Sequence, residues 1–256
     1  MEWSAPGIVL GTRRHSEADV ILEVMTAEHG RHLGLVRGGR SRRQQPVLQP
    51  GNEVQLTWRA RLQDHLGMFT VELVKPRAAE MMASAVALNG VQHLAFLLRL
   101  VPERHANSRL FNALELVLEH LNQADIAAPL MVRFELELLQ ELGFGLDLTS
   151  CAATGRTDDL AYVSPKSSRA VSRDAGRPYH DKLLPLPSFL VEGQRQSGSE
   201  ISFTDIAEGF RLTSYFLERH VLAPRAIAAK DNRSALVGAL EKHYRLEQPW
   251  NFIDSP

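Results

Sequence analysis

Arginines crowd one short stretch of the chain, and their spacing suits the binding of phosphate groups. In "GLVRGGRSRRQQPVLQPG", residues 34–51, a Gly-Gly pair precedes Arg40, Arg42 and Arg43. Adjacent glycines let the backbone turn sharply and approach a ligand closely, and guanidinium forks match phosphate oxygens. A phosphate-binding enzyme loop would lead into a helix, whereas this one leads into another strand pattern. Two interpretations remain: a surface that binds a polynucleotide backbone, and a solvated loop.

The basic character extends beyond this loop, although the whole chain has a net charge of only −1. Residues 31–61 hold seven arginines and a single acid, Glu53. The pattern predicts that Arg59 and Arg61 project from a neighbouring strand and widen the basic patch. The nucleic-acid contacts that we predict are Arg13, Arg14, Arg31, Arg37, Arg40, Arg42, Arg43, Arg59 and Arg61.

Aromatic side chains decide whether such a surface stacks on bases or binds the backbone. Trp58 falls on the same strand face as Val54 and Leu56, which favours packing in the core over stacking on a base. Phe69 is the other candidate. We therefore predict a backbone binder that tolerates sequence and is sensitive to salt.

A second kind of binding residue is Arg133, a lone cation in the acidic helical stretch "MVRFELELLQELGF". It could pair with Glu137 one turn later on the helix. Alternatively, it could accept an acidic peptide.

The one cysteine, Cys151, lies in a stretch with the spacing of a zinc ribbon, which needs two C-x-x-C knuckles about 15–20 residues apart. Positions 151, 154, 172 and 175 have this spacing, but they hold Cys, Thr, Ser and Ala. Threonine, serine and alanine do not hold structural zinc. We predict no bound metal and no cofactor.

Catalytic motifs give little support to an enzyme. The ten histidines form neither H-x-x-x-H nor H-E-x-x-H, and no G-x-S-x-G or Walker pattern occurs. The acidic pair in "TDD", residues 157–159, is more typical of a turn. We predict a protein that is not an enzyme; the rival is a hydrolase whose His, Asp and Glu meet only in the fold.

The elements that must position these residues change in character near residue 78. Five strand patterns, at 7–14, 18–26, 32–39, 52–62 and 67–74, predict a five-stranded barrel of the OB type over residues 1–78. Residues 79–256 follow as a helical domain with an insert at about 150–180. The predicted class is α+β with more than one domain.

Several boundaries follow from local signals. The chain is expected to be folded from about Gly7, without a leader sequence or a membrane span, and its lone cysteine fits a reducing compartment. The first helical run is expected to break near Asn89-Gly90, and a later helix to begin at Pro129. Ser202 or Thr204 could cap another helix, and "EGQRQSGSE" (192–200) should be a loop.

Four segments together resemble the RecO family of bacterial recombination-mediator repair proteins. They are "GIVLGTRRHSEADVILEVMTAEHGRHLGLVRGGRSRR" (7–43), "LQPG" (48–51), "RFELELLQELGFGLDLTSCAATG" (133–155) and "YVSPKSSRAVSRDAGRPY" (162–179). The last of these segments resembles the family's insert, in which some members carry four zinc cysteines and others do not. Later, "RLTSYFLERH" (211–220) departs from the family's basic "L-K-S-R": it keeps Ser214 but has Thr213 and Tyr215 in place of the two charged residues.

The resemblance implies an OB domain, a helical domain and a degenerate zinc-ribbon-like insert. It implies binding to single- and double-stranded DNA, annealing of complementary strands, and partnership with RecR in loading RecA onto DNA coated by single-strand-binding protein. It implies that the acidic C-terminal tail of single-strand-binding protein binds the helical domain at Arg133. It also implies that this chain works in the cytoplasm, associated with the nucleoid. An OB-fold RNA-binding protein is the alternative.

Overall fold

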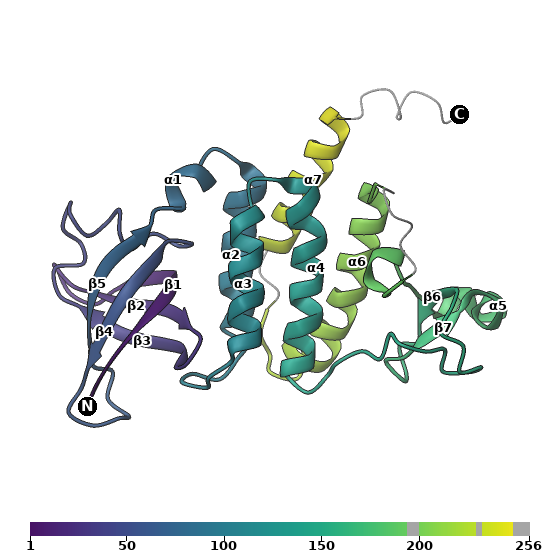
Figure 1. Ribbon diagram of the computed structural model, residues 1–256, viewed down its shortest axis with the longest axis horizontal. Helices are drawn as coiled ribbons and strands as arrows, with labels where there is room; N and C mark the ends of the chain where they lie inside the picture. The colour runs from purple at the N-terminus through teal and green to yellow at the C-terminus, as the bar shows by residue number, and fades with distance from the viewer. Residues whose placement is uncertain (194–199, 229–231, 248–256) are drawn as a thin grey trace. The chain divides into compact units, whose positions relative to one another are not determined.

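The computed structural model describes residues 1–193, 200–228 and 232–247, and the chain divides into two compact units, residues 1–122 and 123–256 (Figure 1). The predicted boundary at residue 78 lies inside the first unit, between its barrel and its helices. Much of the predicted loop 192–200 falls outside the described residues.

The first unit begins with a closed five-stranded barrel in the order β1-β2-β3-β5-β4. This confirms the predicted barrel followed by helices. The strands are β1 (Glu2–Arg14), β2 (Val20–Thr26), β3 (Gly30–Val36), β4 (Glu53–Arg59) and β5 (Met68–Lys75). Neighbours pair antiparallel except β3 and β5, whose parallel pairing at Leu35 and Met68 closes the barrel.

Strand β1 starts at Glu2, five residues before the predicted Gly7. The first half of β1 pairs with β4 and the second half with β2, and the register shifts between Val9 and Gly11. One long strand thus serves two neighbours, and a bulge lets it bend around the barrel. Inward-facing residues of all five strands fill the interior, among them Val9, Val24, Leu56 and Phe69.

Three helices complete the first unit: α1 (Ala78–Met81), α2 (Ala85–Leu98) and α3 (Ser108–His120). The predicted break at Asn89-Gly90 is wrong, because α2 runs through both residues. The interruption lies at Ser84, whose side chain accepts a hydrogen bond from the Ala87 amide and caps α2. On α3, the apolar face of Leu110, Leu114, Val117 and Leu118 is buried.

The second unit contains the helices α4 (Ala124–Glu141), α5 (Arg173–Gly176), α6 (Phe203–Leu217) and α7 (Asn232–Glu247), and a three-stranded sheet of β6 (Leu160–Val163), β7 (Ala170–Ser172) and β8 (Leu184–Pro185). Pro129 lies inside α4 rather than at its start, since the helix begins at Ala124. Ser202 and Asp205 form a reciprocal capping box at the start of α6, which selects Ser202 over Thr204.

Strand β6 is the central strand of the sheet, and β6, β7 and α5 fall within the range 150–180 that was predicted as an insert, whereas β8 lies beyond it. No helix in the described part of the chain is long and apolar enough to cross a membrane.

Candidate nucleic-acid interface

Six of the nine predicted arginines gather at one end of the barrel. Arg13 and Arg14 end β1, where Arg14 pairs in register with Val20 of β2. Val20 in turn pairs with Val36, the last residue of β3. Arg37 follows directly, and the next loop carries the remaining members. We call this set the hairpin-end arginines: Arg13, Arg14, Arg37, Arg40, Arg42 and Arg43.

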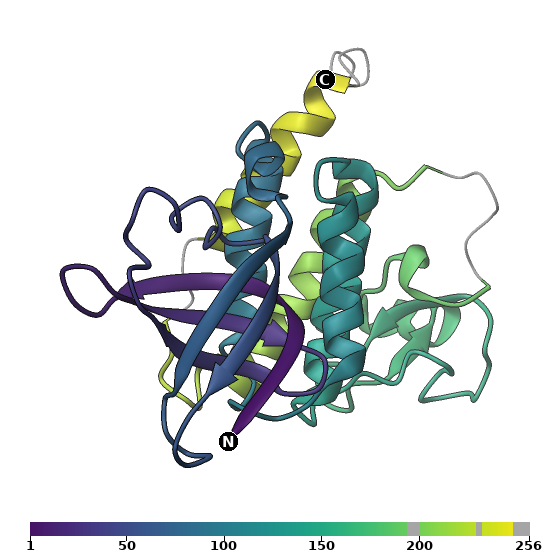
Figure 2. The same cartoon turned by 60° about the vertical axis from the view of Figure 1, so that its left-hand side comes forward.

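Hydrogen bonds from two backbone amides of the arginine loop hold it against the β1–β2 hairpin. The Arg40 amide donates to the Ala18 carbonyl at 3.0 Å, and the Gly38 amide donates to Asp19 Oδ1 at 2.8 Å. Figure 2 shows the hairpin in purple and the dark-blue loop on the left-hand side. Contacts from two segments therefore fix where the hairpin-end arginines lie.

The Gly-Gly pair shapes this loop in two different ways. Gly38 has a φ of +64°, a left-handed conformation that glycine adopts without strain. Gly39 has a close neighbour instead: a Cβ there would come within 2.4 Å of Val20 Cγ2. We expected these glycines to let the backbone approach a ligand closely, but Gly39 instead lets the loop approach the protein's own β1–β2 hairpin.

The loop is also anchored at its far end by Asn52, which is buried. Its side-chain nitrogen, Nδ2, donates to the Pro46 and Val47 carbonyls at 2.8 and 3.1 Å. Its Oδ1 accepts from the Ala78 amide at 2.9 Å. One buried side chain therefore ties the loop to the start of α1.

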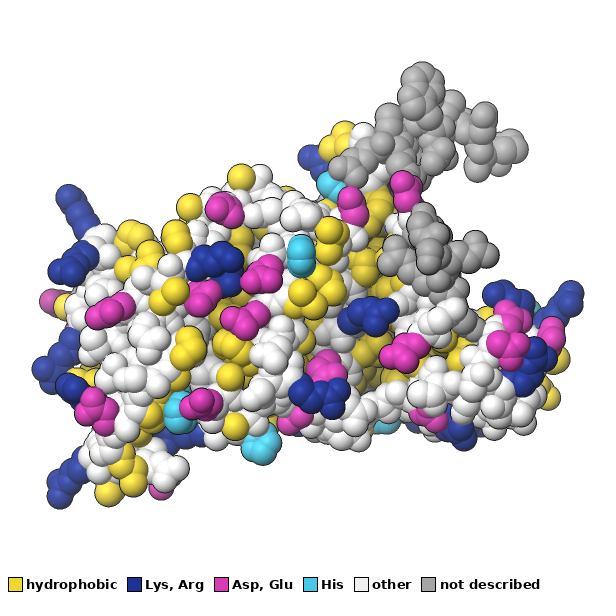
Figure 3. Space-filling model, viewed as in Figure 1, with side chains coloured by type: hydrophobic (Ala, Val, Ile, Leu, Met, Phe, Trp, Pro, Cys, Tyr) yellow, Lys and Arg dark blue, Asp and Glu magenta, His cyan; other side chains and the backbone are white. Residues whose placement is uncertain are grey.

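The hairpin-end arginines are exposed, and none of them forms an ion pair with a carboxylate among the described residues. Arg40 Nη1 donates to the Glu17 carbonyl at 2.7 Å, and Arg14 Nε donates to the Ser16 carbonyl at 3.3 Å. Neutral carbonyls orient these guanidiniums without cancelling their charge. Figure 3 shows dark-blue side chains projecting from the barrel, at the left of the view.

Arg31 differs from that set because carboxylates engage its charge. Only 12% of its side chain is exposed, and its Nη1 lies 2.8 Å from Glu23 Oε1 and 3.5 Å from Glu103 Oε1. Glu23 also binds Arg99 Nε at 2.7 Å. This network joins β2 and β3 to the end of α2, so Arg31 has a structural contact and we leave it out of the interface.

Arg59 and Arg61 do not widen the patch as predicted. Arg59 pairs in register with Glu2, at the opposite end of β1 from Arg14. The 13 residues of β1 span roughly 40 Å along the strand at about 3.3 Å per residue. Arg59 Nη2 also lies 2.8 Å from Glu2 Oε1, and Arg61 follows in the β4–β5 connection. The two residues form a separate basic site.

The aromatic residues confirm the expected role of Trp58. Trp58 and Phe69 are buried in the barrel, and Trp58 Nε1 donates to the Leu66 carbonyl at 3.0 Å. His32 packs edge-on against Trp58 with centroids 5.1 Å apart. Burial, and then the charge of Arg104, lower the pKa of His32 to about 4, so this ring is neutral at pH 7.

Trp3 is an aromatic residue that the sequence reasoning did not consider. It is half-buried and stacks on His29 with centroids 4.0 Å apart. Its position in a strand could have identified Trp3, but the predicted first strand began only at Gly7 and so did not include it. Like Arg59, Trp3 lies at the end of β1 remote from the hairpin-end arginines.

Arg133 is exposed on α4, and its guanidinium donates to the backbone carbonyl of Phe189. In the part of the chain that the structure describes, it forms no ion pair with a carboxylate, so the predicted pairing with Glu137 is not seen. The contact holds the guanidinium beside the segment that follows β8. Its remaining donors could bind an acidic ligand.

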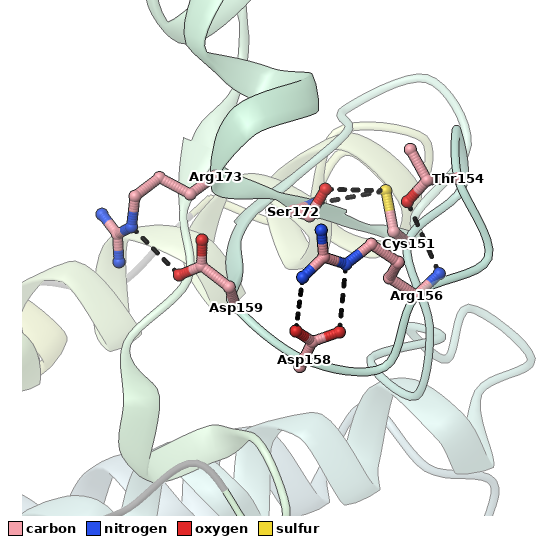
Figure 4. Close-up of polar contacts among 7 residues, drawn as sticks. All are labelled: Cys151, Thr154, Arg156, Asp158, Asp159, Ser172 and Arg173. Atoms are coloured by element: carbon pink, nitrogen blue, oxygen red, sulfur yellow. Dashed lines mark hydrogen bonds and ion pairs between the residues drawn. The ribbon is translucent and has the colours of Figure 1, made fainter.

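Cys151, whose spacing is that of a zinc-ribbon ligand, is a buried residue. The side chain is 1% exposed, and its Sγ accepts hydrogen bonds from the Ser172 amide at 3.2 Å and the Ser172 hydroxyl at 3.4 Å (Figure 4). Two of the four spaced positions, 151 and 172, thus meet at this sulfur, while the Thr154 hydroxyl accepts from the Arg156 amide at 3.4 Å (Figure 4).

The surroundings of that sulfur explain its ionisation. Burial raises the pKa of the Cys151 thiol, but hydrogen bonds from Ser172, Thr154 and the Ala153 backbone outweigh burial and lower the pKa to about 6. A lowered pKa favours the thiolate. Burial nevertheless withholds the sulfur from reagents, so Cys151 acts as a hydrogen-bonded core residue of the insert.

The acidic pair in "TDD" is engaged by arginines of the insert. Asp158 lies 2.6 Å from Arg156 Nη2, and Asp159 lies 3.1 Å from Arg173 Nε (Figure 4). Among the described residues, no group of three or more His, Cys, Asp or Glu side chains could hold a metal ion.

Two family models match the chain. "Recombination protein O N terminal" matches residues 1–77, and "Recombination protein O C terminal" matches residues 86–226. The first range covers the barrel with the hairpin-end arginines. The second covers the helices from α2 to α6 and the insert.

Curated relatives match over nearly the whole chain. A protein of Mesorhizobium japonicum named DNA repair protein RecO is 58% identical over 244 residues, covering 95% of each chain. Proteins of the same name from Chelativorans sp. and Brucella abortus are 54% and 51% identical. They cover 95% and 97% of this chain, and 97% and 99% of their own.

Proposed function

Because the chain belongs to the recombination protein O family of DNA repair proteins, we propose that it is a recombination mediator that binds DNA through the hairpin-end arginines. The observation that carries this proposal is their exposure without carboxylate partners at one end of the barrel. The turn between β1 and β2 (15–19) and the arginine loop (37–51) together hold only two acids, Glu17 and Asp19.

Binding of this kind is driven by the release of counterions from phosphates. It makes no bond and breaks none, and the bases of the bound strand stay free where no aromatic side chain stacks on them. Two strands whose charges are neutralised in this way can pair. This supports annealing of complementary strands, with binding to single- and double-stranded DNA.

The proposed partners act on the two units separately. The acidic C-terminal tail of single-strand-binding protein binds at Arg133 in the second unit and brings the barrel to coated DNA. Together with RecR, the protein then helps to load RecA onto this coated DNA. What supports this step is the exposed Arg133 guanidinium, held by the Phe189 carbonyl without a carboxylate partner in the described chain.

The affinity for single-stranded DNA is expected to fall steeply with salt. About six phosphate contacts give a slope near −4 in a plot of log K against log salt concentration. Fluorescence anisotropy with a labelled oligonucleotide at rising salt measures this slope. Binding that does not depend on salt would contradict the proposal, and tighter binding of an RNA competitor would favour an RNA-binding protein.

Charge reversal at Arg133 is expected to weaken binding of the acidic tail peptide by about tenfold or more, because a charge-assisted contact becomes a repulsion. Affinity for naked DNA should not change. A matched control is Arg211→Glu, since Arg211 is also an exposed arginine of the second unit. Equal loss of peptide and DNA binding by R133E would merge the two sites and refute this assignment.

A further inference from the structure

A small pocket lies beside the hairpin-end arginines, between the β1–β2 hairpin and the arginine loop. Its volume is about 210 Å³, which is below the roughly 300 Å³ typical of sites for drug-sized ligands. The residues that line it are Thr12, Arg14, Val20, Gly39, Arg40, Gln45, Leu48 and Gln49. A site of this size suits one flat ring rather than a whole nucleotide.

The lining combines apolar walls with polar groups of fixed orientation. Val20 and Leu48 are buried side chains of the barrel core. Arg14 and Arg40 are both oriented by carbonyls of the hairpin, those of Ser16 and Glu17. Two cations therefore flank a partly apolar hollow, the arrangement expected where an anionic chain carries a flat apolar group.

Two glutamines supply acceptors to the same hollow. Gln45 Nε2 donates to the Arg40 carbonyl at 3.0 Å, and Gln49 Nε2 donates to the Gln45 carbonyl at 2.8 Å. Because a carbonyl can only accept, these contacts fix which end of each amide is nitrogen. Each amide oxygen is left as an acceptor with no partner among the described residues.

We propose that this pocket receives one unstacked nucleobase of a single strand whose phosphates lie on the hairpin-end arginines. Carboxamide oxygens accept from the N–H groups of base edges, and guanidinium planes stack on bases where aromatic side chains are absent. This inference rests on the proposed function and extends it, because the base contact is separate from the phosphate contacts.

The pocket also gives the barrel a means of preferring single strands. A base in a duplex is paired and stacked, so its extraction costs free energy, whereas a base in a single strand is already available. Only one base per protein is held, so its neighbours in the strand remain free to pair.

The test compares an oligothymidylate with an abasic oligomer of the same length, which keeps every phosphate and lacks the bases. The full-length protein should bind the abasic oligomer about tenfold more weakly, with the same salt dependence. The variant Gln45→Leu/Gln49→Leu keeps all arginines and should lose this difference by weakening only its binding to oligothymidylate. Gln63→Leu, outside the pocket lining, is the matched control and should keep the difference.

The outcomes of this test distinguish failure of the base pocket from failure of the proposed DNA-binding function. Equal affinity of the unaltered protein for both oligomers, with a steep salt dependence, overturns the pocket and leaves the proposed function standing. A base preference that survives in the double variant also overturns the pocket. Failure to bind either oligomer overturns the proposed function and the pocket with it. Unchanged abasic binding by the double variant shows that it is folded.

Discussion

Replacing Arg40, Arg42 and Arg43 with alanine together is expected to lower the affinity for single-stranded DNA by about 100-fold at about 50 mM salt. Each phosphate contact on a single strand contributes roughly 0.7 to the slope of log K against log salt. Loss of three contacts should therefore reduce the slope by about two. The loss in affinity should shrink as salt rises, because counterion release is its source.

Anisotropy titrations at several salt concentrations measure both quantities. Arg40 also holds the hairpin through the Glu17 carbonyl, so R42A/R43A is a second variant that leaves this contact intact. It should show more than half of the loss in binding free energy that the triple variant shows, while its circular dichroism spectrum stays unchanged.

The matched control removes basic residues from the other end of the barrel. R59A/R61A changes Arg59, which pairs with Glu2, and the exposed Arg61, and its effect on affinity should be much smaller than that of R42A/R43A. If the two double variants lose equal affinity, the interface does not lie at the hairpin end. If the triple variant binds as tightly as the unaltered protein, the arginine loop has no place in DNA binding.

Strand faces could be predicted from the sequence because burial has a period of two in a half-buried strand. Val54, Leu56 and Trp58 are buried, and the arginine loop was found from its glycines and charges alone. These features depend on residues close together in the chain. Boundaries were less accurate where tertiary pairing decides them, as at the start of β1.

The roles of individual arginines could not be predicted, because their partners are remote in sequence. Arg31 has the same local surroundings as an exposed arginine, yet Glu103, 72 residues later, closes its ion-pair network. Arg14 lies on β1 and Arg59 on its neighbour β4, and only the pairing register places them at opposite ends of β1. Cys151 and Ser172, which were singled out only for their spacing, do contact each other through hydrogen bonds to the cysteine sulfur.

A buried ion pair in the second unit was missed for the same reason. Glu135 on α4 is fully buried, and its carboxylate accepts from Arg233 of α7 and from the Thr213 hydroxyl of α6. Arg233 also donates to the Phe210 carbonyl at 2.9 Å and to the Ser214 hydroxyl. Thr213 and Ser214 thus connect α6 to α4 and to α7. They have this structural role in the segment where the family resemblance led us to expect basic residues.

Glu135→Ala is expected to lower the free energy of unfolding of the second unit by about 3–5 kcal/mol, because it leaves the Arg233 charge without its buried partner. Urea unfolding followed by circular dichroism measures the change. Glu241→Ala on α7 removes an exposed i,i+4 partner of Arg245 and is the matched control, with a cost below about 1 kcal/mol.

The double variant Glu135→Leu/Arg233→Leu separates loss of the pair from loss of one partner. Apolar replacement of a whole buried pair is often nearly neutral, whereas removal of one partner leaves an uncompensated charge. The double variant should therefore be more stable than Glu135→Ala, despite carrying the additional change. If the effects of the two single leucine substitutions simply add, Glu135 and Arg233 do not interact and the bridge between α4 and α7 is refuted.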